Sequence, residues 1–267
     1  MIAFGIGGRK QHIAVVEMEG TIGPGIKAAE FARLFRSLEE SARVKAVVLD
    51  IDSPGGSASG SDYLYLSASA LAAKKPVVAF IRGTGASGAY LLSCAAAKII
   101  AIPSAIIGSI GVISMRPLLY EALDRLSLRM AVTKSDRFKD MGSMFRPATA
   151  EEEAKEQALV DELFDQFVDA VAKGRNMERE AARAVATGEV FTARKGVELG
   201  LVDEVGDLHR AIEVAAELGK VAPKPVWVHP RRGLRELVSS FTTTALLDNI
   251  VARVEDRARR AIYYQRF

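Results

Sequence analysis

The sequence predicts an α/β domain built on a largely parallel sheet, and three observations support this fold class. Strand-like segments rich in β-branched residues alternate with helical patterns along most of the chain. Two of these segments, AVVLDI and VVAFI, are apolar without interruption, which is typical of parallel strands covered on both faces. The spacing of strand, helix and strand indicates βαβ units with right-handed crossovers.

The elements follow one another in a regular order through the first hundred residues. Strands are expected where β-branched and apolar residues cluster, at residues 13–22, 44–52, 76–83 and 98–102. Helices are expected where the pattern turns helical, at residues 25–42, 61–73 and 86–96.

The pattern continues in the middle of the chain with a strand at 110–115, a helix at 117–127 and a strand at 129–135. A loop follows over residues 136–148. Thr149 and Glu152 then have the spacing of a capping box, so a long helix is expected directly after them.

Composition places the chain among ordinary globular proteins and excludes several functional classes. Of its 267 residues, 49% are hydrophobic and 26% are charged, and the net charge of +3 gives no case for nucleic-acid binding. The single cysteine, Cys94, excludes an internal disulfide, and no Cys/His cluster indicates zinc, so no cofactor is expected. The apolar stretch at the N-terminus is too short for a membrane helix or a signal peptide. We therefore expect a soluble chain, cytoplasmic or peripheral to a membrane, unless an anchor precedes it.

A proline-rich break divides the chain into two expected regions. Three prolines fall within eight residues after residue 222, so we expect a catalytic domain at 1–222 and a linker with a helical extension at 223–267. In the extension, Leu246, Ile250 and Val254 share one helical face. This helix could pack on its own domain, dock between subunits or lie on a membrane surface.

Three glycine-bearing segments, DSPGGSASG, GTGASGAY and IGSIGVIS, each follow a strand-like run. Because sites gather at the carboxyl ends of parallel strands, these loops are expected to converge. The second loop presents the hydroxyl of Ser87 where a helix begins, and the first exposes backbone N–H groups. A nucleophile beside backbone N–H groups that can stabilise an oxyanion indicates acyl-transfer chemistry. Neither glycine motif for phosphate binding occurs between a strand and a helix, so nucleotide binding is disfavoured.

A serine nucleophile needs a base, and the three histidines do not supply an obvious one. His12 precedes the first strand, His209 lies in a late helix and His229 lies in the proline-rich break. A lysine can serve if burial or like charges lower its pKa by about three units, which corresponds to roughly 4 kcal/mol. Lys139, in the loop before the capped helix, is the candidate, although a solvated surface lysine is the simpler interpretation of such a residue.

Five motifs in order, DSPGGS, ASGAYLLSCAA, IIGSIGVI, SDRFKDMGSMFRPATAEE and GLVDEVG, resemble the signal peptide peptidase A-like serine proteases of peptidase family S49. The resemblance covers roughly residues 12–215. It implies a ClpP/crotonase-like fold of repeated β-β-α and βαβ units. The family pattern has Tyr and Pro where this chain has Phe138 and Met144, and both changes keep an apolar side chain.

The resemblance also implies a role for each matching residue. Ser87 is the expected nucleophile and Lys139 the general base, and the Ser109 hydroxyl orients the lysine. The backbone N–H of Gly88, with that of Gly55 or Gly56, is expected to form the oxyanion hole.

Partners and substrates follow from the same resemblance. Family members bind unfolded peptides or signal peptide remnants as extended strands. They assemble into homo-oligomeric rings or domes in which a neighbouring subunit can supply the lysine. Three alternatives stay open: a stomatin-operon type protease with one dedicated partner, a crotonase-type acyl-CoA enzyme on the same fold, and a non-catalytic scaffold.

Overall fold

The computed structural model describes residues 11–230, which form two compact units. The first unit contains residues 11–110 and 168–230, and the second contains residues 111–167. One helix, α5 (Ala150–Arg175), begins in the second unit, and its residues from Val168 onward belong to the first. All strands found between residues 11 and 230 belong to the first unit.

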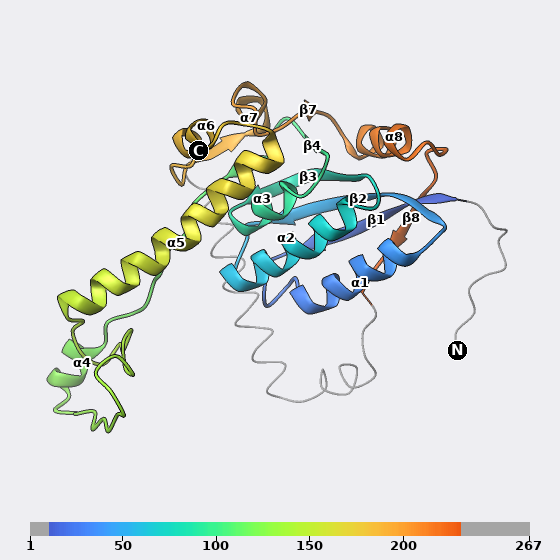
Figure 1. Cartoon of the computed structure of the whole chain (residues 1–267). Coiled ribbons are helices and arrows are strands. Elements are labelled where there is room, and N and C mark those ends of the chain that lie inside the picture. The colour runs from blue at the N-terminus through green and yellow to red at the C-terminus, as the bar shows by residue number, and fades with distance from the viewer. Residues whose placement is uncertain (1–10, 231–267) are drawn as a thin grey trace, which may run out of the picture. The chain divides into compact units, whose positions relative to one another are not determined.

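An eight-stranded sheet forms the core of the first unit (Figure 1). Its strands lie in the order β6-β5-β3-β2-β1-β8, and β4 pairs with both β3 and β7. Every pair is parallel except β5 with β6. The bounds are β1 (His12–Glu19), β2 (Val44–Ser53), β3 (Val77–Ala86), β4 (Lys98–Ala101), β5 (Ile106–Gly108), β6 (Val190–Thr192), β7 (Glu204–Val205) and β8 (Pro225–Val228). The predicted α/β class with a largely parallel sheet is confirmed.

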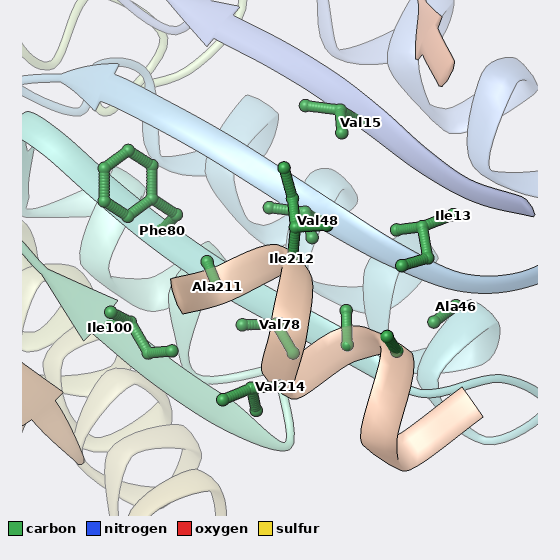
Figure 2. Close-up of a cluster of buried hydrophobic side chains, with 12 residues drawn as sticks. Ile13, Val15, Ala46, Val48, Val78, Phe80, Ile100, Ala211, Ile212 and Val214 are labelled. Atoms are coloured by element: carbon green, nitrogen blue, oxygen red, sulfur yellow. The ribbon is translucent and has the colours of Figure 1, made fainter. Parts of the chain in front are cut away.

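Helices cover both faces of this sheet. Helix α8 (Leu208–Gly219) packs on one face, where Val15, Val48 and Ile212 join one buried apolar cluster (Figure 2). The other face is covered by α1 (Ala28–Glu40), α2 (Ala58–Ala72) and α3 (Gly88–Ser93), of which α1 contacts α2 and α2 contacts α3 (Figure 1). Burial on both faces explains why β2 and β3 read as continuous apolar runs.

The second unit departs from the sequence prediction. Two strands and one helix were expected between residues 110 and 135. Only the helix is present, as the shorter α4 (Tyr120–Arg125). The strands expected at 110–115 and 129–135 are wrong, because a strand needs a neighbour to satisfy its backbone and this part of the described chain offers none. Apolar side chains of both segments are exposed in the single chain, Ile113 by 83% and Val132 by 56%.

The start of α5 confirms the predicted capping box. The Glu152 amide donates to Thr149 Oγ1 at 3.2 Å, and the Thr149 amide donates to a Glu152 carboxylate oxygen at 2.9 Å. These reciprocal bonds satisfy two backbone donors at the helix start and hold the preceding loop against it.

The last described residues bear on the expected extension. Strand β8 pairs in parallel with β1, so part of the expected linker adds an edge strand to the sheet. Two short helices, α6 (Arg179–Val185) and α7 (Ala193–Glu198), lie between α5 and β7. The expected apolar face of Leu246, Ile250 and Val254 lies outside the described residues. Within residues 11–230, no helix combines the length and the apolarity that crossing a membrane requires.

Candidate active site

Ser87 lies at the turn between β3 and α3, with a backbone conformation that a side chain rarely adopts. Its φ is 52° and its ψ is −125°, and it is the residue that immediately precedes α3. Positive φ strains any residue that carries a Cβ, and such strain gathers at functional sites. The side chain is half-buried, while its neighbours Ala86 and Gly88 are buried. The turn therefore presents one hydroxyl at the end of a buried strand.

The loop after β2 comes so close to this turn that only glycine fits. A Cβ on Gly55, whose φ is +91°, would lie 2.7 Å from the Gly88 amide nitrogen and 2.9 Å from the Ser87 Cβ. A Cβ on Gly56 would lie 2.7 Å from the backbone nitrogen of Ile22. These obstacles are mostly backbone atoms, which cannot rotate away. The glycines of SPGG thus bring one loop against the backbone of the other.

The backbone amides of these glycines are not equivalent. The Gly55 amide donates to the Ser53 hydroxyl at 3.2 Å, within its own loop. The amides of Gly56 and Gly88 donate to no acceptor among residues 11–230. A backbone N–H next to a nucleophile and without a protein acceptor is what an oxyanion hole needs.

Two buried or half-buried side chains behind the glycines were not singled out by sequence reasoning. Asp52 accepts a hydrogen bond from the Thr84 amide at 2.9 Å, at the point where the register between β2 and β3 shifts. Ser61, which is 1% exposed, lies directly behind Gly88, where an added Cβ would come within 2.6 Å of the Ser61 Cβ. The only sequence signal was that Asp52 directly precedes SPGG.

The third glycine segment, IGSIGVIS, is joined to the Ser87 turn by a hydrogen bond between backbone atoms. The Ser87 amide donates to the Gly108 carbonyl at 2.8 Å, and the Ser109 amide donates to the Glu189 carbonyl at 2.6 Å. Ser109 is half-buried and also has a positive φ, of 51°. The predicted convergence of the three loops is therefore confirmed, and it brings together Ser87, Ser109 and the three glycines within the first unit.

Lys139 lies in the second unit, in a turn between α4 and α5. Its amide donates to the Asp136 carbonyl at 3.1 Å, and its side chain is exposed in the single chain. Its neighbour Phe138 packs beneath two cations, with the Arg137 guanidinium carbon 4.4 Å and the Lys155 ammonium 4.7 Å from the ring centroid. The lysine is thus an exposed side chain on an anchored turn.

None of the three histidines belongs to a glycine segment. His12 opens β1, His209 lies on α8 with its Nδ1 3.2 Å from Glu213, and His229 directly follows β8. Within residues 11–230 no group of side chains is arranged to hold a metal ion.

A buried carboxylate lies on β2, two residues before Asp52. Asp50 is 3% exposed, and burial raises its pKa from 3.8 to about 6 although Arg82 opposes this shift. The Arg82 Nε lies 3.4 Å from Asp50 and a second guanidinium nitrogen bonds Glu19 at 2.8 Å. Burial likewise raises the pKa of Cys94 to about 12, which makes this thiol unreactive.

Comparison with known proteins points to one family. The sequence model of peptidase family S49 matches residues 69–222. A protease-named protein of Methanocaldococcus jannaschii is 35% identical over 195 residues, covering 73% of this chain and 63% of that protein. Another, from Synechocystis, is 34% identical over 233 residues, covering 87% of this chain and 83% of that protein.

Two further comparisons are with a longer relative and with a solved structure. The chloroplastic serine protease SPPA of Arabidopsis thaliana is 31% identical over 81% of this chain, which spans only 34% of that protein. The structure of an S97A mutant of the 1510-N membrane-bound stomatin-specific protease covers 83% of this chain and 99% of its own, with a TM-score of 0.55. At 15% identity that likeness shows the fold alone.

Proposed function

The chain belongs to peptidase family S49, and from that premise we propose that it is a serine endopeptidase whose nucleophile is Ser87 and whose general base is Lys139. The observation that carries the proposal is the turn at Ser87, a strained, half-buried serine next to Gly88 and closely approached by the SPGG loop, where the amides of Gly56 and Gly88 donate to no acceptor among residues 11–230. That arrangement has no evident structural purpose, because strain and close glycine contacts cost stability.

The amides suggest which glycines stabilise the oxyanion. The Gly55 amide is engaged by Ser53, whereas those of Gly56 and Gly88 are not. We therefore assign the oxyanion hole to Gly56 and Gly88, with Gly55 providing the close approach. Removing one such donor typically lowers kcat by about 10²–10³-fold.

The choice of base rests on elimination and on the family. No histidine lies in the loops around Ser87, while Lys139 occupies the matching position of the family motif. Its ammonium must lose its proton to act, which requires removal from water. Because Lys139 is exposed in the single chain, assembly or bound substrate is expected to desolvate it. Ser109 is then the hydroxyl proposed to orient the neutral amine.

The reaction proceeds in two halves. The Ser87 Oγ attacks the scissile carbonyl carbon as its proton passes to Lys139 Nζ, and the oxyanion accepts hydrogen bonds from the two amides. The intermediate collapses when Lys139 returns that proton to the leaving amine, which breaks the C–N bond and leaves an acyl-enzyme. Water then attacks the ester carbonyl carbon as the same lysine takes its proton. The bond between that carbon and Ser87 Oγ breaks, the serine oxygen takes the proton back from the lysine, and the acid is released.

Substrates and assembly are proposed on the same footing. We infer that unfolded or signal-peptide-like chains bind extended beside the glycine loops. A homo-oligomer is supported by the apolar side chains that the second unit exposes, among them Met115 at 83% and Leu126 at 68%. Such an assembly could also associate with a membrane surface.

A second candidate is a protease with one dedicated partner. It is favoured only by the fold neighbour, which is named as a stomatin-specific protease. A non-catalytic scaffold is the remaining alternative, and it predicts that Ser87 never reacts with a serine-directed probe.

The test compares wild type with Ser87→Ala and Lys139→Ala in cleavage of unfolded casein and a signal peptide. A fluorophosphonate probe, which phosphonylates a reactive serine, reports the nucleophilicity of Ser87 across the pH range. Arg129→Ala is the matched control, because it removes one positive charge from an exposed side chain of the same unit. We expect both dyad variants to lose cleavage and the control to keep it. Lys139→Ala activity equal to that of the control would contradict the dyad, and no reaction of wild type would favour the scaffold.

A further inference from the structure

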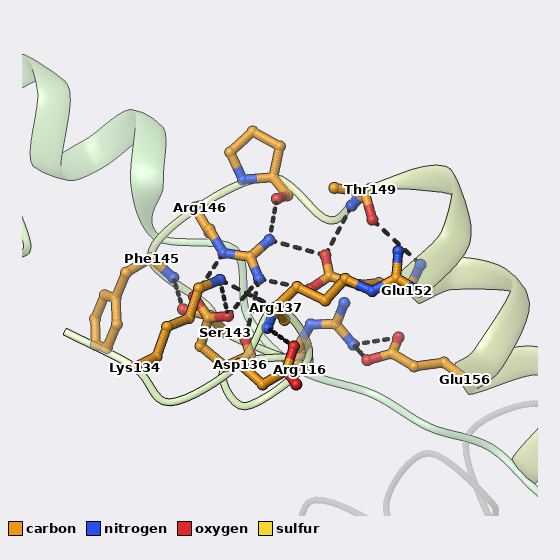
Figure 3. A network of polar contacts seen from close by, with 12 residues as sticks. Arg116, Lys134, Asp136, Arg137, Ser143, Phe145, Arg146, Thr149, Glu152 and Glu156 are labelled. Carbon is orange, nitrogen blue, oxygen red and sulfur yellow. Dashed lines mark hydrogen bonds and ion pairs between the residues drawn. The ribbon is translucent and has the colours of Figure 1, made fainter. Parts of the chain in front are cut away.

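Asp140, the residue after Lys139, is held by Arg146, six positions further along the chain. Arg146 donates from Nε to Asp140 Oδ2 at 2.9 Å and from a terminal nitrogen to Asp140 Oδ1 at 2.9 Å, so the pairing is bidentate (Figure 3). Lys134 donates to the same carboxylate at 2.6 Å. These charge-assisted bonds hold the pKa of Asp140 well below its usual range.

The same guanidinium also binds the start of α5. Arg146 donates to Glu152 Oε2 at 2.8 Å and to the other Glu152 oxygen, and to the Pro147 carbonyl at 3.0 Å. Glu152 is 3% exposed and belongs to the capping box with Thr149. Arg146 and the capping bonds lower the pKa of Glu152 to about 2, so the carboxylate stays charged. One guanidinium therefore fixes the turn of Lys139 to the first turn of a long helix.

The other neighbour of Lys139 is held independently. Phe138 lies beneath Arg137 and Lys155, and Lys155 extends from α5. The backbone on both sides of Lys139 is thus anchored, while its side chain is left exposed. An arrangement that fixes the neighbours and frees the amine suits a lysine that must be presented to something else.

We propose that Arg146 is a positioning residue for Lys139, because it fixes Asp140 to Glu152 and so sets where the lysine stands. The inference rests on the proposed role of Lys139 as the base. A planar guanidinium can bind two carboxylates at once in fixed geometry, which an ammonium cannot. Without it, the turn gains backbone freedom that must be lost again before proton transfer.

A second ion pair in the same unit provides a matched control. Arg116 donates twice to Glu156, at 2.6 and 2.7 Å, one helical turn further along α5. Both bonds come from one guanidinium nitrogen, and the carboxylate belongs to the same helix, but neither partner is next to Lys139 in the sequence. Arg116→Ala therefore reports what losing such a pair does to the unit as a whole.

The experiment uses the full chain with Arg146→Ala, Arg146→Lys, Arg116→Ala, Lys139→Ala and the double variant Arg146→Ala/Lys139→Ala. Peptide cleavage gives kcat and KM across the pH range. Labelling by a fluorophosphonate, whose fluoride leaving group keeps the reaction measurable without a base, gives the rate at which the Ser87 hydroxyl is phosphonylated. Gel filtration and thermal unfolding show whether assembly and stability match between the arginine variants.

We expect Arg146→Ala to lower kcat by about 10²-fold with little change in KM, because a displaced catalytic group loses about that much. Arg146→Lys should recover little, and Arg116→Ala should stay close to wild type. In the Lys139→Ala background, Arg146→Ala should cause no further loss in labelling, since two residues acting through one group are not additive.

The outcomes separate this inference from the proposed function. If Lys139→Ala is inactive but Arg146→Ala and Arg116→Ala have the same kcat, the positioning role is overturned and the dyad stands. The same conclusion follows if Arg146→Ala lowers the labelling rate further in the Lys139→Ala background. If Lys139→Ala cleaves at the wild-type rate, the dyad is overturned and the positioning role with it.

Discussion

The backbone strain at Ser87 predicts a difference in stability between two inactive variants of this residue. Ser87→Gly and Ser87→Ala both remove the hydroxyl, so the difference between them isolates the Cβ. With φ at 52° and ψ at −125°, the alanine variant keeps the strain and the glycine variant relieves it. We therefore expect Ser87→Gly to be the more stable of the two inactive proteins.

The magnitude follows from two opposing effects. A side chain in a sparsely populated backbone region costs about 1–3 kcal/mol. Glycine loses more conformational freedom on folding than alanine, which costs roughly 0.5–1 kcal/mol. Taking the middle of both ranges, the net gain for Ser87→Gly over Ser87→Ala is about 1 kcal/mol. For a chain of this size that raises Tm by about 2–4 °C.

Thermal unfolding of the two variants measures this difference, with denaturant unfolding as a check. Ala89→Gly is the matched control, because Ala89 lies two residues along in α3, 1% exposed and in helical conformation. There glycine should lower stability by about 1 kcal/mol. If Ser87→Gly is no more stable than Ser87→Ala, the turn stores no strain and the reasoning is refuted.

Three further predictions concern the groups behind the site. Gly88→Ala should lower Tm and abolish cleavage, and adding Ser61→Gly should restore part of the Tm, since Ser61 is what the new Cβ meets; no recovery in a melting curve would contradict this. Asp52→Ala should lower kcat more than Asp52→Asn, because the amide oxygen can still accept from Thr84; equal kcat values would remove the role of this bond. The pKa of Asp50 is raised from 3.8 to about 6 in the folded protein, so its contribution to stability falls as the pH rises through that range. Asp50→Asn should therefore show a smaller fall in the free energy of unfolding, measured in urea at the two ends of the range, and an unchanged fall would argue against the raised pKa.

The first four strands, β1 to β4, could be predicted because their signal is local and strong, whereas the short strands β5, β6, β7 and β8 were not predicted. Segments 44–52 and 76–83 are apolar on both faces, and each finds parallel neighbours. Segment 129–135 has similar β-branched residues but no strand beside it within the described chain. Strand formation depends on that neighbour, which sequence pattern does not reveal.

The site was predictable to the level of loops but not of individual contacts. Glycine-rich segments at strand ends indicated that the loops converge, and the turn at Ser87 agrees. Asp52 and Ser61 were missed because their roles depend on a register shift and on a close approach between distant segments. Arg146 was missed for a similar reason, since its two carboxylates are separated along the sequence and meet only when the turn folds back on α5.

The main-chain bonds that join the loops have a practical consequence for labelling the enzyme. The Ser87 amide donates to the Gly108 carbonyl. The amide of Ser109, which follows Gly108, donates to the carbonyl of Glu189, and the Glu189 side chain is exposed. Because these links use no side chain, position 189 can be replaced by cysteine and carry a dye without cutting them. A fluorophore there would be linked to the Ser87 backbone through two backbone hydrogen bonds, and we expect its emission to change when Ser87 is acylated.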